Sequence, residues 1–375
     1  MHDLSAFFSP LPYIETIDKE AFHPLQWGAH VKALTSEDFD WEEADIVIVG
    51  CGESRGANAN FSDAPNTIRK YFYELFVWHP QLKVVDAGNI LEGATEADTK
   101  AALALVLKEL EAAGKTVLVL GGSQDLTLEQ YNAFRAAHKT IQAVAVDMLI
   151  DLEETAVVND RSYLMNILTE DPNFIQHFTH IGFQSYFVQP QMLQTLDMLR
   201  FDCLRLGKVR SQLSIVEPPM RDAHLLTVDM NAVKYSDAPI NKNGSPNGFA
   251  GDEMCQLMKY AGMSQHLQSI GLYGYDPTLD QEDMTARLMA QMLWYFIDGF
   301  SWRAQEASLS DTASFLSFHV QMQHQDTLFM KSKKTNRWWM QLPDASMVPC
   351  TYEDYLCACN DEIPDRWLRI QERLS

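Results

Sequence analysis

Positive charge is scarce in this chain. Its 375 residues include 29 Lys and Arg against 51 Asp and Glu, which gives a formal net charge of −22 at pH 7. A field of that sign repels phosphate backbones, so we expect no nucleic-acid partner. Long apolar runs are also missing. The longest, around residues 288–300, contains Asp298 and is too short to cross a bilayer, so we expect no membrane span.

Cysteine is sparse as well, with six residues scattered along the chain. Cys350, Cys357 and Cys359 lie close together, but no CxxC pair and no His-x-x-x-His sequence accompanies them. Their spacing indicates neither a disulfide framework nor a zinc site. The first 26 residues lack a basic region followed by an apolar core, which argues against a signal peptide. Reduced thiols then predict a cytoplasmic protein.

The middle of the chain alternates apolar runs with helical patterns. Helical spacing covers residues 95–113, 126–137, 252–261 and 284–297. Thr95 is a predicted N-cap, because Asp98 follows three residues later. The apolar runs are typical of buried parallel strands and cover residues 45–50, 82–86, 116–120, 142–147, 180–183, 225–229 and 269–274. This alternation predicts a three-layer α/β/α fold with a mainly parallel central sheet.

The pattern changes near residue 310. Segments 327–332 and 337–342 flank the polar residues 333–336 and predict a β-hairpin. Short helical pieces broken by Pro364 follow. We therefore expect an N-terminal extension (1–40), an α/β domain (41–309) and a C-terminal appendage (310–375). The basic residues Lys331, Lys333, Lys334 and Arg337 could face an acidic neighbour in an oligomer, although a solvated turn is the simpler interpretation.

Polar residues follow three of the predicted strands. Gln124 comes after the run ending in Gly121-Gly122, Asp147 and Asp151 follow the next strand, and Asp229 ends a third. In parallel sheets, ligands bind beyond the carboxyl ends of the strands. Buried carboxylates there need a cation or another partner, and their oxygens suit a hard divalent ion. The alternative is that one or two of them cap the following loops.

Several segments in this order resemble motifs of one family. Ala64-Pro-Asn-Thr-Ile-Arg69 is similar to GPxxIR, Val85-Asp-Ala-Gly-Asn-Ile90 to DxGdI, and Thr285-Ala-Arg287 to a TAR sequence. Together with the strand ends they resemble the ureohydrolase superfamily, which includes arginase, agmatinase and formimidoylglutamase. The resemblance covers roughly residues 40–300. It implies an arginase-like fold and, in the family, two manganese ions held by the motifs GGDHS, DAHxD and SxDxD.

The resemblance implies one reduced metal site. One family site maps onto Gln124, Asp147, Asp151 and Asp229, which all offer oxygen, so a single Mn, Mg or Ca ion is implied. The other site requires donors at Leu149 and Asn231, which are an apolar and a neutral residue. A dinuclear manganese centre is therefore not expected. The glutamate that grips the guanidinium in the family falls on Gly274. No catalytic residue is assigned.

The two histidines nearest these strands are expected to lie away from this edge, whereas His319 and His324 in the appendage could reach it. His180 and His224 precede their predicted strands, which places both at the amino end of the sheet. Neither is then expected to replace the lost ligands.

Three hypotheses for function remain open. The first is a divergent family member that lacks the dinuclear centre and does not hydrolyse guanidino compounds. The second is an active hydrolase of linear amidines, most similar to formimidoylglutamase, with a remodelled site for a small amidine or amino-acid-like ligand. The third is a binding or scaffold protein. Because the family often forms symmetric oligomers, a homo-oligomer is one assembly that the resemblance implies.

Overall fold

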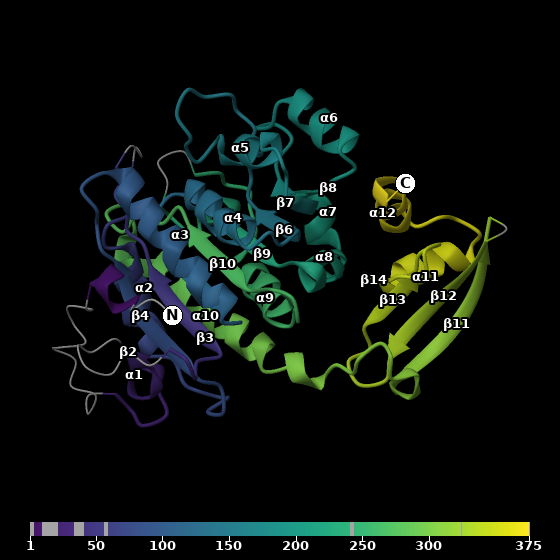
Figure 1. Ribbon diagram of the computed structural model, residues 1–375, viewed down its shortest axis with the longest axis horizontal. Helices are drawn as coiled ribbons and strands as arrows, with labels where there is room; N and C mark the ends of the chain where they lie inside the picture. The colour runs from purple at the N-terminus through teal and green to yellow at the C-terminus, as the bar shows by residue number, and fades with distance from the viewer. Residues whose placement is uncertain are drawn as a thin grey trace.

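The computed structural model describes residues 4–9, 22–33, 41–55, 59–240, 244–323 and 325–374. Most of the expected N-terminal extension lies outside these ranges. A large sheet forms the centre of the molecule, and a smaller sheet built by residues 315–350 lies beside it (Figure 1). None of the helices in the described ranges is long and apolar enough to span a membrane.

The central sheet has ten strands in the order β1-β4-β3-β5-β10-β9-β6-β7-β8, with β2 paired to β4. All pairs are parallel except β1 with β4. The strands are β1 Phe8–Ser9, β2 Lys32–Ala33, β3 Ile46–Gly50, β4 Val84–Ile90, β5 Thr116–Leu120, β6 Ile141–Val146, β7 Ile175–Phe183, β8 Asp202–Arg205, β9 Leu225–Asp229 and β10 Ser269–Tyr273.

Helices cover both faces of this sheet, so the expected α/β fold with a mainly parallel sheet is confirmed (Figure 1). The α-helices of this part are α1 Trp27–His30, α2 Ala64–Tyr73, α3 Glu96–Ala112, α4 Thr127–Ala136, α5 Tyr163–Thr169, α6 Pro190–Met198, α7 Leu206–Ser211, α8 Glu217–Asp222, α9 Gly251–Gly262 and α10 Met284–Phe300. Thr95 caps α3 as expected, with Asp98 completing a capping box.

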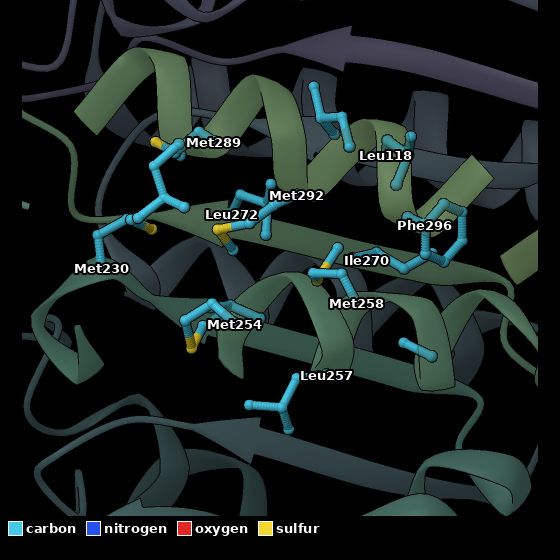
Figure 2. Packing of buried hydrophobic residues seen from close by; sticks show 14 of the residues in the cluster. Leu118, Met230, Met254, Leu257, Met258, Ile270, Leu272, Met289, Met292 and Phe296 are labelled. Carbon is cyan, nitrogen blue, oxygen red and sulfur yellow. The ribbon is translucent and has the colours of Figure 1, made fainter. Parts of the chain in front are cut away.

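Alternate residues of the strands supply the two halves of the core. In β3, Ile46 and Ile48 face the layer that contains α2, α9 and α10, whereas Val47 and Val49 face α3. This is the period-2 pattern of a sheet buried on both sides. Figure 2 shows the first layer, where methionines of α9 and α10 pack on Ile270 and Leu272 of β10. Methionine fills irregular gaps between helices and sheet.

Two of the segments that resemble family motifs form one buried ion pair. The Nε and Nη2 atoms of Arg69 in α2 lie 2.7 and 2.9 Å from the carboxylate oxygens of Asp86 in β4. Both side chains are fully buried, and the hydroxyl of Tyr73 donates to the same carboxylate at 2.8 Å. A fully paired, bidentate geometry is what allows such charges to stay in a core. The pair fixes α2 against the sheet.

The C-terminal part forms an antiparallel sheet in the order β11-β12-β13-β14. The predicted hairpin is confirmed as β12 and β13, and the predicted break at Pro364 separates two helices. The elements are β11 Phe315–Met322, β12 Gln325–Ser332, β13 Trp338–Gln341, β14 Met347–Cys350, α11 Tyr352–Cys359 and α12 Asp365–Leu374. Short 3-10 turns include η3 Gln124–Leu126, η5 Met230–Ala232 and η8 Thr312–Ser314.

Helix α8 holds this sheet to the main domain. The guanidinium of Arg221 lies 4.4 Å from the ring centre of Trp339 and donates to the carbonyl of Trp338 at 2.9 Å. Glu217 forms ion pairs with both Arg221 and Arg337. Arg337 is buried, so one member of the predicted basic run serves an internal contact rather than a solvated turn.

Helices α9 and α10 meet through a pair of glycines. A Cβ atom at Gly262 would lie 2.1 Å from the carbonyl oxygen of Phe296, and one at Gly299 would lie 2.2 Å from the carbonyl oxygen of Lys259. No side chain fits between the two backbones at these points. The close approach lets both helices pack on the same strands.

We expect Gly262→Ala to lower the free energy of unfolding by about 3 kcal/mol, because the added methyl group forces two backbones apart. Chemical denaturation measures this change. Gly207→Ala in α7 is the matched control, since no atom of the described residues lies within 4 Å of the place that its Cβ would occupy. That variant should be neutral or more stable by up to about 1 kcal/mol. Equal stability of the two variants would contradict the close approach.

Candidate functional site

Four neighbouring strands of the central sheet end at the predicted site. Strands β5, β10, β9 and β6 lie side by side, and Gln124, Gly274, Asp229 and Asp147 occupy or follow their carboxyl ends. The loop after β6 then returns Asp151 to the same place, where its carboxylate interacts with those of Asp147 and Asp229. The four side chains predicted from the sequence to share a site therefore converge.

These side chains are deeply buried. Gln124, Asp147, Asp151 and Asp229 retain only 1–5% of their exposure. Burial raises the pKa of Asp147 well above its usual value, and the charges of Asp151 and Asp229 raise it further. The pKa of Asp151 is raised in the same way, and burial raises that of Asp229 to about 7. Three carboxylates that interact with one another and are excluded from water cannot all stay charged without a compensating group.

Gln124 supplies part of that compensation. We assign its amide nitrogen to the carboxylates, because in this orientation the nitrogen donates to Asp147 Oδ2 at 3.2 Å and to Asp151 Oδ2 at 3.3 Å. The amide oxygen then accepts from the hydroxyl of Thr227 at 3.3 Å. The reverse orientation would turn the amide oxygen toward two acceptors. Gln124 thus bridges two carboxylates as a hydrogen-bond donor.

Asp229 occupies the space that a side chain at position 274 would need. A Cβ atom on Gly274 would lie 2.8 Å from Asp229 Oδ1 and 3.0 Å from Oδ2. Gly274 also has a φ angle of +77°, which a residue with a side chain adopts only with strain. A glutamate at position 274, as the resemblance implies for the family, would therefore require Asp229 to move. With Asp229 in this orientation, no larger residue fits there.

The two positions that the resemblance assigns to the second metal site are less buried than the carboxylates. Leu149 and Asn231 are half-buried, and Leu149 has no donor atom to offer. The backbone amide of Asn231 donates to Asp229 Oδ1 at 2.6 Å. This hydrogen bond uses one of the carboxylate lone pairs that a metal would require.

The placement of His180 at the amino end of the sheet was wrong. His180 lies inside β7, which begins at Ile175, and its Nε2 atom is 3.1 Å from the carbonyl oxygen of Asp147. Burial lowers its pKa to about 4, so the ring is neutral and donates this hydrogen bond. It therefore contacts the backbone at the end of β6 through Nε2. His224 precedes β9, as expected.

Sequence reasoning missed two residues of the site. Thr227 binds the amide of Gln124, and Tyr163 in α5 is buried within the field of the three carboxylates. Thr227 could have been identified from the sequence, because it lies two residues before Asp229 and therefore faces the same side of β9. Nothing in the sequence pattern marks Tyr163.

The arrangement fits two metal ions poorly. In the described part of the chain, no three His, Cys, Asp or Glu side chains are arranged so that they could hold a metal together. A single ion has one point in its favour: Asp147 Oδ1 is buried without a hydrogen-bond partner. For Gln124 to join it as an oxygen ligand, the amide would have to rotate and give up Thr227.

The fold and this strand-end site define an arginase-family protein. The arginase family model matches residues 44–298, and the chain belongs to that family. Formimidoylglutamase from Staphylococcus aureus (strain MSSA476) is 23% identical over 72% of this chain and 92% of its own length. Formimidoylglutamase from Bacillus subtilis is 25% identical, but the alignment covers only 48% of this chain and 60% of that protein.

Solved structures give the same fold. A Trypanosoma cruzi formiminoglutamase determined with Mn²⁺ aligns with a TM-score of 0.65 at 20% identity, over 71% of this chain and 97% of its own. The Bacillus subtilis formimidoylglutamase structure aligns with a TM-score of 0.64 at 19% identity, over 72% of this chain and 90% of its own. The expected membership of the ureohydrolase superfamily is confirmed.

We expect Gln124→Met to lower the free energy of unfolding by about 2–4 kcal/mol in metal-free buffer, because two buried carboxylates lose a donor. Urea denaturation measures this change. In an Asp151→Asn background the same substitution should cost at least about 1 kcal/mol less, since one of the two acceptors is no longer a carboxylate. Additive effects of the two substitutions would show that the amide does not bridge the pair.

Proposed function

We propose that this protein is a divergent arginase-family member without the dinuclear manganese centre. It holds at most one hard divalent ion, through Gln124, Asp147, Asp151 and Asp229, and does not hydrolyse guanidino compounds. The observation on which this rests is the amide of Gln124, which donates to the carboxylates that would otherwise bind a cation. The assembly of the protein and its cytoplasmic location stay predictions; six free cysteines agree with the latter.

The absence of guanidino hydrolysis follows from the role that two metal ions would play in the reaction. A pair of cations jointly lowers the pKa of a bridging water and positions the resulting nucleophile. Leu149 cannot ligate, and Asn231 lacks the charge that would offset a second ion. A single ion lacks the bridging position. This chain's own residues can then orient a ligand through amide and carboxyl groups, but they do not assemble the family's nucleophile.

A second candidate is an active hydrolase of linear amidines. The relatives named formimidoylglutamase favour it, and three aspartates of the family's ligand set are present. It requires the loops that carry Leu149 and Asn231 to rearrange around substrate. A binding or scaffold role is the third candidate, and it becomes the favoured one if neither metal nor turnover is found.

Metal content separates these candidates first. After equilibration with manganese, magnesium or calcium, we expect at most one ion per chain by mass spectrometry, because only one set of oxygen donors is available, and it requires the amide of Gln124 to rotate. Any bound ion should be lost in Asp229→Ala. Asp125→Asn is the control, since that carboxylate is also buried but pairs with Lys100 outside the donor set. Two manganese ions per chain would contradict the proposal.

Turnover is the second test. With added manganese, the protein should release neither urea from arginine or agmatine nor formamide from formiminoglutamate above the level of the Asp229→Ala variant. Product release is measured colorimetrically, with an active formimidoylglutamase as positive control. Formamide release that disappears in Asp229→Ala would establish the second candidate and overturn the first.

A further inference from the structure

Strand β8 ends the central sheet on the side of the appendage. It pairs with β7, and no strand in the described ranges pairs with its other side. Helix α12 stands between this edge and the C-terminal sheet (Figure 1). A cavity of about 760 Å³ lies along the edge, between β8, α7 and α8 of the main domain and α11 and α12 of the appendage. A sheet edge that borders a cavity can accept a further strand.

The backbone groups that β8 turns toward the cavity follow from the ladder. The amide of Asp147 donates to the carbonyl of Ile181, so Ile181 bonds to β6 and its neighbour His180 bonds to β8. Cys203 is the register partner of His180. In a parallel ladder His180 then bonds to the two neighbours of its register partner, so Cys203 turns its own N–H and C=O outward. Cys203 also lines the cavity.

Arginines of α12 already bind at the beginning of this edge. Arg369 donates from Nη1 to the carbonyl of Phe201 at 3.3 Å, and Arg373 donates to the carbonyl of Arg200 at 2.7 Å. Phe201 lies two residues before Cys203, so its outward carbonyl agrees with the direction derived from the ladder. These contacts also show that guanidinium groups bind the backbone at this edge.

The lining of the cavity is acidic. It contains six carboxylates and three cations. Two of the cations, Arg366 and Arg369, form ion pairs with lining carboxylates. The third is Lys208. Three of the carboxylates are exposed and form no ion pair in the described part of the chain, namely Glu353, Glu362 and Asp365. An excess of unpaired carboxylates attracts positively charged side chains.

Apolar side chains complete the lining. Phe183, Leu204, Ile215 and Pro219 of the main domain and Ile363 of the appendage all border the cavity. A segment with basic side chains alone would leave these contacts unused. An occupant that carries both basic and apolar side chains therefore matches the lining best.

We propose that the β8 edge is a peptide-binding site whose occupant is an extended segment of another protein with basic and apolar side chains. The segment adds to β8 as the next strand and bonds to the N–H and C=O of Cys203. Its basic side chains lie near Glu353, Glu362 and Asp365. The strand-end site lies at the ends of other strands, so this proposal is independent of the function proposed above.

Charge favours another protein over this chain as the source of the segment. The two longest segments outside the described ranges, residues 10–21 and 34–40, contain six acidic residues and one lysine, so neither suits an acidic cavity. A second copy carries a net charge of −22 and is repelled at long range. The same field attracts a basic segment toward the cavity.

A pool of short fluorescent peptides, in which Lys or Arg alternates with Val, Leu or Phe, tests the proposal on the full chain. Fluorescence anisotropy should show micromolar binding. Replacing Glu353 and Glu362 together by Gln should weaken it about tenfold, because two unpaired carboxylates are lost. The matched control replaces Asp326 and Asp344 by Asn, which removes the same charge from exposed positions of the appendage outside the cavity lining. It should leave the affinity unchanged.

Backbone pairing is tested on the peptide, which leaves the protein unchanged. In the tightest-binding peptide, N-methylation of one alternate set of amides should abolish binding, whereas methylation of the other set should not, because only one set faces β8. Bound peptide should also slow hydrogen exchange of the β8 amides. Thermal denaturation of each protein variant checks folding.

Four results would overturn the proposal. The first is that no peptide of the pool binds. The second is that the two pairs of carboxylate substitutions weaken binding equally, and the third is that both methylation patterns do so. The fourth is a dimer that the peptides dissociate in sedimentation experiments, which would identify a second copy of this chain as the occupant.

Discussion

Repulsion among three buried carboxylates is the constraint that organises the functional site. Asp147, Asp151 and Asp229 meet where the interior is dry, and leaving several charges there costs several kcal/mol per ion. The family resemblance implies two cations at this place. Here the compensation comes from hydrogen-bond donors on Gln124 and Asn231 and from raised pKa values. Asn231 is neutral, so its side chain adds no further negative charge to this group.

The fold does not depend on that compensation. Its stability resides in the two core layers of the sheet and in the Arg69–Asp86 pair, which lies on α2 and β4 rather than on the strands that carry the carboxylates. The site residues occupy strand ends and loops. Residues at such a site can change while the packing below it stays intact, so membership of the family does not by itself fix what the site binds.

Local patterns predicted the fold, whereas the sequence indicated the shared site of the carboxylates only as a possibility, because their convergence depends on the geometry of the loop that carries Asp151. The strand runs, the Thr95 cap and the hairpin all have periods or turn signals that act over a few residues. The convergence of Asp147 and Asp229 follows from parallel strands ending at one edge. Side-chain direction was not predictable, because it depends on partners far along the chain. The Gln124 amide is oriented by Thr227, and β7 extends to Ile175 through the polar residues Gln176 and His177, so His180 was misplaced.

The same limit applies to the appendage. The sequence indicated a hairpin. It did not indicate the contacts that hold the appendage, such as the ion pairs of Arg221 and Arg337 with Glu217 and the contacts of Arg221 with Trp338 and Trp339. Although burial opposes it, the two guanidinium groups keep the pKa of Glu217 below its usual value, so the network stays charged. Helix α8, which carries Glu217 and Arg221, also contacts β14, and β11 is the opposite edge of the same sheet. The position of the appendage thus depends on contacts between residues far apart in the sequence, such as Arg221 and Trp338, which no local pattern reveals.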